Sequence, residues 1–196
     1  MKFENVSFTS NTSCLIYNEY GHVTDSGSTF TRNTMSDEYE YGPVYYGFNI
    51  STGTFTNTVL TSNYSNVQSG GFYISGKTSK LTLNNVTATE NRADKGGVIF
   101  VEKKAYFEIS DSVFESNQAE EGSVIYIIAN RGQAAFANGS TFRSNTGIGT
   151  IFLLDGTITL TSCTIESNTV GANGNETAGV YALLSDIYST TNTIRN

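Results

Sequence analysis

The chain repeats a short pattern in which an apolar residue is followed, three positions later, by asparagine. The apolar positions are Phe8, Phe30, Leu60, Ala88, Phe114, Phe142 and Ile165, and the asparagines are Asn11, Asn33, Asn63, Asn91, Asn117, Asn145 and Asn168. Successive asparagines are 22, 30, 28, 26, 28 and 23 residues apart. This period indicates a solenoid, in which each unit buries its apolar face against its neighbours. The stacked asparagines are expected to form an amide ladder, each side chain bonding to the next coil.

A strand is expected before each of these motifs. Five repeats carry a large apolar residue eight places before the asparagine, and apolar residues two places earlier extend the alternation. A period of two is expected of a half-buried strand. Small or polar residues then mark a corner, where left-handed or locally hydrogen-bonded backbone costs little: Asn5, Asn57, Asn85, Asp111, Gly139 and Ser162.

A third strand is predicted downstream of the asparagine. Glycine-led apolar runs occupy residues 72–74, 98–101, 124–127 and 151–153, and their β-branched content with weak alternation favours strands that pack inward. Three short strands per repeat describe a parallel β-helix, whereas helical spacing of 3.6 is missing. We therefore predict an all-β solenoid of about seven coils, forming a single domain over residues 1–196.

The residue after each apolar position is expected to point outward. This column contains Thr9, Thr31, Thr61, Thr89, Glu115, Arg143 and Glu166. Like positions of successive coils stack directly, so like charges should be avoided, and the charged members do alternate in sign.

Both ends of the array fall within a repeat. Met1 already occupies an inward position, and Ile194 occupies the apolar position close to the last residue. An open solenoid end exposes core residues and unpaired strand edges. The sequence is therefore expected to be a segment of a longer chain, or else a subunit that stacks end to end into a filament.

Composition narrows the classes of partner and compartment. A net charge of −7 argues against nucleic acid, and no segment approaches the roughly 20 apolar residues of a membrane span. Among the Asn-X-Ser/Thr sequences, those at Asn49, Asn138 and Asn175 lie in or near expected loops and are glycosylation candidates. An extracellular or cell-surface location is the expectation.

The two cysteines are not expected to pair. Cys14 and Cys163 lie too far apart along the array to form a disulfide, and each is expected to be a free thiol.

Catalytic chemistry is not favoured by the placement of the carboxylates. Polysaccharide-cleaving β-helices need two or three carboxylates within about 5–10 Å, whereas the aspartates here fall at different phases of the repeat. No catalytic residue, cofactor or metal site is assigned, although the acidic stretches 37–40 and 120–121 could hold calcium weakly.

The insertion over residues 35–48 is the segment most typical of binding. Insertions in solenoids project from one face, and tyrosines beside carboxylates can stack on sugars or anchor a protein contact. The candidate binding residues are Asp37, Glu38, Tyr39, Glu40 and Tyr41. At least two of Tyr45, Tyr46 and Phe48 are expected to be core residues of the third strand instead.

The motifs carry a family resemblance that covers nearly the whole chain. Phe-x-x-Asn at residues 8–11, 30–33, 114–117 and 142–145, with Gly-Gly-Val-Ile at 96–99, resembles the repeats of polymorphic outer-membrane proteins. Similar repeats occur in surface proteins of protists within the pectin-lyase-like superfamily. The resemblance implies a right-handed parallel β-helix at a cell surface, often used for adhesion.

We accordingly expect a non-enzymatic scaffold or adhesion module whose partner is a protein or a glycan. The alternative is a polysaccharide-binding or polysaccharide-cleaving β-helix of the pectin-lyase-like type.

Overall fold

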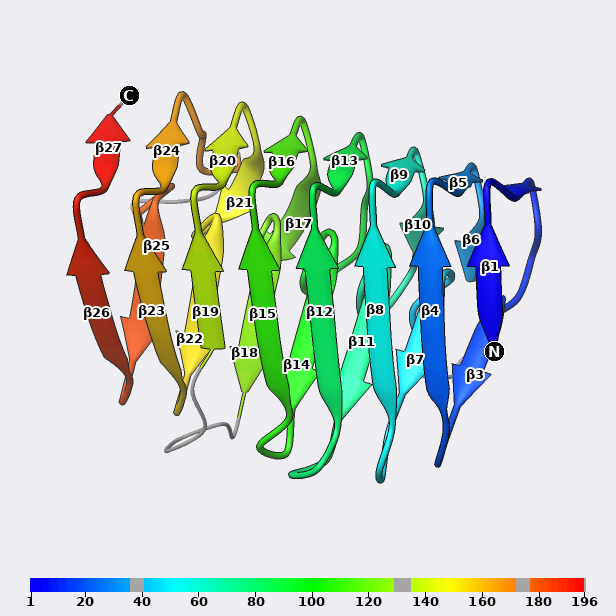
Figure 1. Ribbon diagram of the computed structural model, residues 1–196. Coiled ribbons are helices and arrows are strands. Elements are labelled where there is room, and N and C mark those ends of the chain that lie inside the picture. Colours follow the sequence, from blue (N-terminus) through cyan, green and yellow to red (C-terminus); the bar gives the residue numbers. More distant parts are fainter. Residues whose placement is uncertain (36–40, 129–134, 172–176, 196) are drawn as a thin grey trace.

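The computed structural model describes residues 1–35, 41–128, 135–171 and 177–195. In these residues the regular structure is entirely β, and every strand pair is parallel. Three long sheets run the length of the molecule, two with eight strands and one with seven (Figure 1). The all-β parallel solenoid predicted from the sequence is confirmed.

Sheet A is formed by the first strand of each coil. Its members are β1 (Lys2–Glu4), β4 (His22–Ser26), β8 (Thr52–Thr56), β12 (Lys80–Asn84), β15 (Tyr106–Ser110), β19 (Ala135–Asn138), β23 (Thr157–Thr161) and β26 (Asp186–Thr190).

Sheet B is formed by the strand that follows the corner. Its members are β2 (Ser7–Thr9), β5 (Thr29–Thr31), β9 (Val59–Thr61), β13 (Thr87–Thr89), β16 (Val113–Glu115), β20 (Thr141–Arg143), β24 (Thr164–Glu166) and β27 (Thr193–Arg195).

Sheet C closes each coil. Its members are β3 (Ile16–Asn18), β7 (Tyr45–Gly47), β11 (Phe72–Ser75), β14 (Ile99–Glu102), β18 (Ile125–Ile128), β22 (Ile151–Leu154) and β25 (Val180–Leu183). Two small sheets lie between B and C, one from β6 (Thr34–Met35) and β10 (Tyr64–Ser65), the other from β17 (Gln118–Glu121) and β21 (Thr146–Ile148).

The chain advances along the solenoid axis as it winds. In Figure 1 it rises through sheet A, crosses the top in sheet B and descends behind in sheet C, moving from the N-terminal to the C-terminal end with each coil. This path is right-handed.

The corner between sheets A and B is always two residues long, and its first residue always has a positive φ. The predicted corner residues Asn5, Asn57, Asn85, Asp111, Gly139 and Ser162 have φ between 51° and 57°. This left-handed conformation is accessible to Gly and Asn at low cost. It turns the chain sharply without lengthening the coil, so the strands of sheets A and B keep their register.

The interior is built from files of equivalent side chains. Parallel pairing stacks Phe30 on Leu60 and Phe114 on Phe142, within one file that contains all the apolar residues of the repeated motif. Phe30, Phe114 and Phe142 are all fully buried. These files merge into one continuous core that extends along the solenoid.

The outward column of sheet B also follows the prediction. Glu115, Arg143, Glu166 and Arg195 occupy consecutive coils, and the Arg143 guanidinium lies 2.8 Å from the Glu115 carboxylate. Arg195 pairs in the same way with Glu166, at 2.6 Å. These exposed pairs contribute little stability, and their alternation removes like-charge repulsion between coils.

One inward position departs from the apolar pattern. Asp25 occupies the same inward file as Phe55 and Leu83, and its side chain is 3% exposed. The Thr58 hydroxyl donates a hydrogen bond to Asp25 Oδ2 at 2.5 Å, while Asp25 Oδ1 has no hydrogen-bond partner among the residues that the structure describes. A buried carboxylate of this kind costs folding free energy.

Candidate binding site: an external aromatic ladder and its exposed end

A second file of aromatic rings runs along the outer face of sheet C. We call it the external aromatic ladder, and its members are Tyr17, Tyr46, Tyr73, Phe100, Tyr126, Phe152 and Tyr181. Successive ring centroids are 5.4, 5.1, 5.1, 5.1, 5.0 and 4.6 Å apart. The rings from Tyr73 to Tyr181 are nearly parallel, with interplanar angles between 8° and 15°.

The middle of this ladder is buried although it lies outside the coil. Tyr73, Phe100 and Tyr126 are each only 2% exposed, and Ile148 and Leu154 pack against the same cluster. The Lys95 side chain lies over the Tyr126 ring. Its Nζ is 5.2 Å from the ring centroid and 2.9 Å from Glu121 Oε2. Burial raises the pKa of Tyr126, and the hydrogen bond to Glu121 raises the pKa of Lys95. Sheet C is therefore covered on both faces, which explains the weak alternation of its strands.

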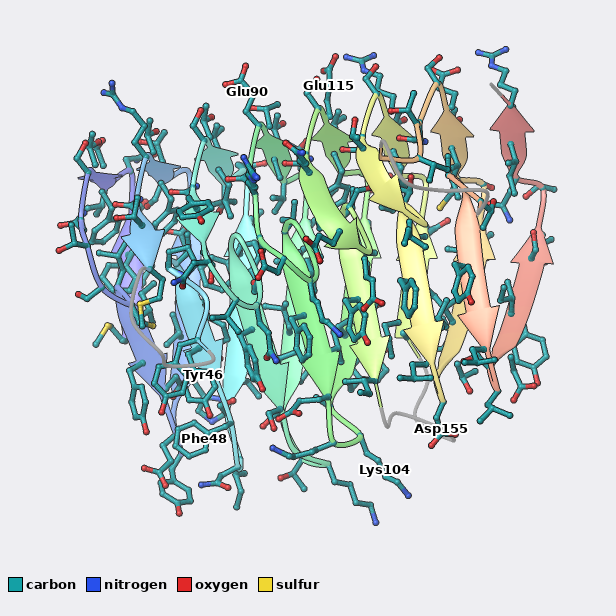
Figure 2. The ribbon with its side chains drawn as sticks, turned by 180° about the vertical axis from the view of Figure 1, so that it is seen from behind. Tyr46, Phe48, Glu90, Lys104, Glu115 and Asp155 are labelled. Carbon is teal, nitrogen blue, oxygen red and sulfur yellow. The ribbon has the colours of Figure 1, made fainter. Side chains whose placement is uncertain are left out.

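The N-terminal end of the ladder widens into an aromatic cluster of Tyr17, Tyr41, Tyr46 and Phe48. The Tyr41 and Tyr46 centroids lie 4.2 Å apart, and Tyr46 stacks on Phe48 at 4.9 Å. Tyr17 meets Tyr41 and Phe48 edge-on, at interplanar angles of 80° and 68°. Figure 2 shows Tyr46 and Phe48 together at the N-terminal end of this outer face. Unlike the middle of the ladder, this end is accessible: Tyr17 is 56% exposed.

A carboxylate and a further tyrosine border the aromatic cluster. Glu19 follows Tyr17 by two residues, and its Oε1 accepts a hydrogen bond of 2.9 Å from Asn49 Nδ2. Tyr20 is 68% exposed, and its hydroxyl lies 3.4 Å from the same Asn49 nitrogen. Desolvation and then the charge of Glu19 raise the pKa of Tyr17, and a hydrogen bond to Glu19 raises the pKa of Tyr20. Within the described part of the chain, Glu19 has no lysine or arginine partner.

The structure places only part of the binding site predicted from the sequence. Asp37, Glu38, Tyr39 and Glu40 lie outside the described residues. Tyr41 is half-buried within the aromatic cluster.

The prediction for the neighbouring aromatic residues was wrong. Tyr45 points into the core and is fully buried, but Tyr46 and Phe48 lie on the outer face because strand residues alternate in direction. Sequence reasoning also missed Tyr17 and Tyr20. The available signal was the recurrence of Tyr or Phe at one position of successive third strands, as in Tyr73, Phe100 and Tyr126.

The asparagines of the repeated motif form a buried amide ladder. From Asn33 onward, each side-chain oxygen accepts two hydrogen bonds from the preceding asparagine: Asn91 Oδ1 accepts from the backbone N–H of Asn63 at 3.0 Å and from Asn63 Nδ2 at 2.9 Å. Asn91 Nδ2 in turn donates to Asn117 Oδ1 at 3.0 Å and to the carbonyl of Leu60 at 3.2 Å. The same pattern links Asn11, Asn33, Asn63, Asn91, Asn117, Asn145 and Asn168.

The glycosylation candidates fall in different surroundings. Asn138 is exposed at the end of β19, and Asn49 is exposed beside the aromatic cluster, whereas Asn175 lies outside the described residues. A glycan on Asn49 would replace a hydrogen on the nitrogen that binds Glu19 and would cover Tyr20. Asn63 also lies in an acceptor sequence, but its side-chain nitrogen is buried in the amide ladder.

Other reactive groups are dispersed. In the described ranges, no three His, Cys, Asp or Glu side chains come together as they would around a metal ion. Cys14 and Cys163 are free thiols, half-buried and buried respectively. The same ranges contain no helix with the length and apolar character needed to cross a membrane.

Comparison with known proteins adds no assignment. No protein-family model, curated protein or solved structure matches the chain.

Proposed function

We propose that the chain is a non-enzymatic β-helix module that acts outside the cell or at the cell surface, as a scaffold and adhesive surface. Its contact region is the aromatic cluster of Tyr17, Tyr41, Tyr46 and Phe48, together with Tyr20. The observation that carries the proposal is the exposure of Tyr17 (56%) and Tyr20 (68%) beside the half-buried rings of the cluster, at one end of a ladder whose middle is covered. The partner is a protein or a glycan.

The physical reason is that the aromatic cluster is held rigidly. Tyr17 and Tyr46 are neighbours in the sheet, and Tyr46 also packs on Tyr73 at 5.1 Å, so the cluster continues directly into the buried ladder. Tyrosine offers large contact area with few rotatable bonds, and rings that are already ordered lose little entropy on binding. Aromatic residues with these properties are enriched at binding interfaces.

Adhesion of coated beads tests the proposal. Beads carrying the protein should attach to cells or extracellular matrix of the source organism, and the double variant Tyr17→Ala/Tyr20→Ala should reduce attachment at least about fivefold, as for contact residues at an interface. Tyr188→Ala is the matched control, since Tyr188 is 60% exposed on β26 in sheet A at the other end of the solenoid. Equal attachment by all variants would refute the role of the aromatic cluster.

The terminal coils support self-association as a second proposal. Ile187 and Ile194 continue inward files of the core, yet they are 40% and 60% exposed, and among the described residues strands β25, β26 and β27 each have one unpaired edge. Parallel edges of this kind accept a further parallel strand. End-to-end stacking would lengthen the particle as concentration rises. Small-angle scattering over a concentration series measures this, and a constant length would exclude it.

A further inference from the structure

We propose that the aromatic cluster, with Glu19, binds a cationic side chain, arginine or lysine, of a partner protein. This inference rests on the proposed adhesive function and narrows it to a partner of one chemistry. It follows from a comparison of this surface with two other places on the same molecule.

In the described ranges, two lysines are each held by a tyrosine ring together with a carboxylate. Lys95 Nζ lies 5.2 Å from the Tyr126 ring centroid and 2.9 Å from Glu121 Oε2. On sheet A, Lys80 Nζ lies 4.9 Å from the Tyr106 ring centroid and 3.4 Å from Glu108 Oε2. In both cases the cation gains from the negative face of the ring and from the carboxylate together.

The N-terminal end of the external aromatic ladder has two of these three elements. Tyr17 and Tyr20 provide exposed rings, and Glu19 between them provides the carboxylate. Glu19 is held by Asn49 Nδ2, a neutral donor, so its charge is not neutralised by a lysine or arginine of the described chain. The charge of Glu19 also contributes to the raised pKa of Tyr17, as expected of a locally negative potential.

The arrangement of the rings favours a cation over a sugar. Sugars stack on a single flat aromatic surface, whereas Tyr17 meets Tyr41 at 80° and Phe48 at 68°. Edge-on packing fills the space between these rings and leaves the exposed part of Tyr17 open to solvent, where the negative face of the ring attracts an ammonium or guanidinium group. The net charge of −7 further steers positively charged partners toward the surface.

The test uses a defined peptide and its neutral counterpart. The protein, carrying ¹³C-labelled tyrosine, is titrated with acetyl-Gly-Arg-Gly-Arg-Gly-amide, and the ring resonances of Tyr17 and Tyr20 are followed by NMR. A peptide with citrulline in place of both arginines has nearly the same shape without the charge. We expect saturable shifts of these two tyrosines with the arginine peptide, and shifts at least about fivefold weaker with the citrulline peptide.

Variants separate charge from shape. Glu19→Gln and Tyr17→Ala should each weaken binding of the arginine peptide at least threefold, while Tyr17→Phe keeps the ring and should bind like the unchanged protein. Tyr188→Ala is the distant control and should leave the affinity unchanged. A thermal melt of each variant, followed by circular dichroism, confirms that the coil remains folded.

The outcomes distinguish this inference from the proposed function. Equal binding of both peptides, or full affinity in Glu19→Gln, would overturn the cationic partner. Failure of the arginine peptide to bind, with bead attachment that still depends on Tyr17 and Tyr20, would also overturn the inference while leaving the adhesive function in place.

Discussion

Phe100 lies directly beside Tyr126 on the outer face of sheet C, with ring centroids 5.1 Å apart and ring planes within 9° of parallel. Both rings are 2% exposed, so they belong to an apolar layer that is almost as well buried from solvent as the core inside the coil. Sheet C is consequently stabilised from both sides, while sheets A and B face solvent through threonine, asparagine and charged residues.

Removal of a ring from the external aromatic ladder should destabilise the solenoid. Phe100→Ala removes two stacked contacts, to Tyr73 and Tyr126, and leaves a cavity. We expect a loss of about 3–5 kcal/mol in the free energy of unfolding. Phe100→Tyr should change it by less than about 1 kcal/mol, because tyrosine already occupies both neighbouring positions. Chemical denaturation measures the difference, and equal stabilities of the two variants would contradict the packing role.

The amide ladder should be sensitive to a single central substitution. Asn91→Ala leaves the buried backbone N–H of Asn63 and the carbonyl of Leu60 without their partners. Each buried unsatisfied group costs about 1–3 kcal/mol, so we expect a total loss of about 2–6 kcal/mol. The control is Asn84→Ala on the exposed face of sheet A, which should change stability by less than about 0.5 kcal/mol. Similar unfolding curves for both variants would refute the ladder's contribution.

Replacement of the buried carboxylate should have the opposite sign. Asp25→Val removes an oxygen that lacks a partner and restores the apolar character of its file, while the Thr58 hydroxyl keeps a second acceptor in the carbonyl of Thr56 at 3.3 Å. We expect stabilisation by about 1–3 kcal/mol, seen as a higher midpoint of thermal unfolding. A lower midpoint would show that Asp25 contributes to the native state through contacts that the valine cannot replace.

The thiol of Cys14 should react slowly at neutral pH. Burial raises its pKa to about 11, from a usual value of 9.0, so less of the reactive thiolate is present at any given pH. Alkylation by iodoacetamide at pH 8 should be about 100-fold slower than for a thiol of ordinary pKa, and the rate should rise about tenfold per pH unit until the pH approaches 11. Mass spectrometry of Cys14-containing peptides measures the rate. A plateau near pH 9 would contradict the raised pKa.

Exposed and buried acceptor asparagines should differ in glycosylation. On secretion from a eukaryotic host, Asn138 is expected to carry a glycan because its side chain is exposed at the end of β19. Asn63 should remain unmodified, since its side-chain nitrogen donates to Asn91 Oδ1 and to the carbonyl of Phe30 inside the molecule. Site-resolved glycopeptide mapping checks both expectations, and a glycan on Asn63 would contradict the ladder.

The fold was predictable because one pair of positions repeats without interruption. Phe30 and Asn33 fix the phase of a whole coil, since the apolar residue must point inward and the amide must meet its neighbours in adjacent coils. Once that phase is known, the alternation in the preceding strand and the glycine-led third strand follow. Asp25 breaks the pattern in one coil, and its neighbours in the file still determine its inward direction.

The candidate site was less predictable because its rings come from different coils. Tyr17 comes from the first coil and Tyr46 from the second, so their contact depends on register in sheet C, where apolar residues occur on both faces. The amino-acid types in these strands therefore could not show which side chains point into the core and which point outward.

A second set of residues with left-handed backbone was also missed. Arg32 and Glu90, just before ladder asparagines, have φ of 52° and 57°, although neither residue type favours that conformation.

The two-residue corner between sheets A and B has an evolutionary consequence. Every coil with strands in both sheets turns there in the same short space, so an added residue would shift the amide ladder and the apolar file by one position. Coil lengths nonetheless differ, because the asparagines are spaced between 22 and 30 residues apart. Insertions and deletions are thus confined to the segments that connect sheet C to sheets A and B. The corner between sheets A and B therefore keeps a constant length, while the segments on the opposite side of the coil can vary in length and sequence.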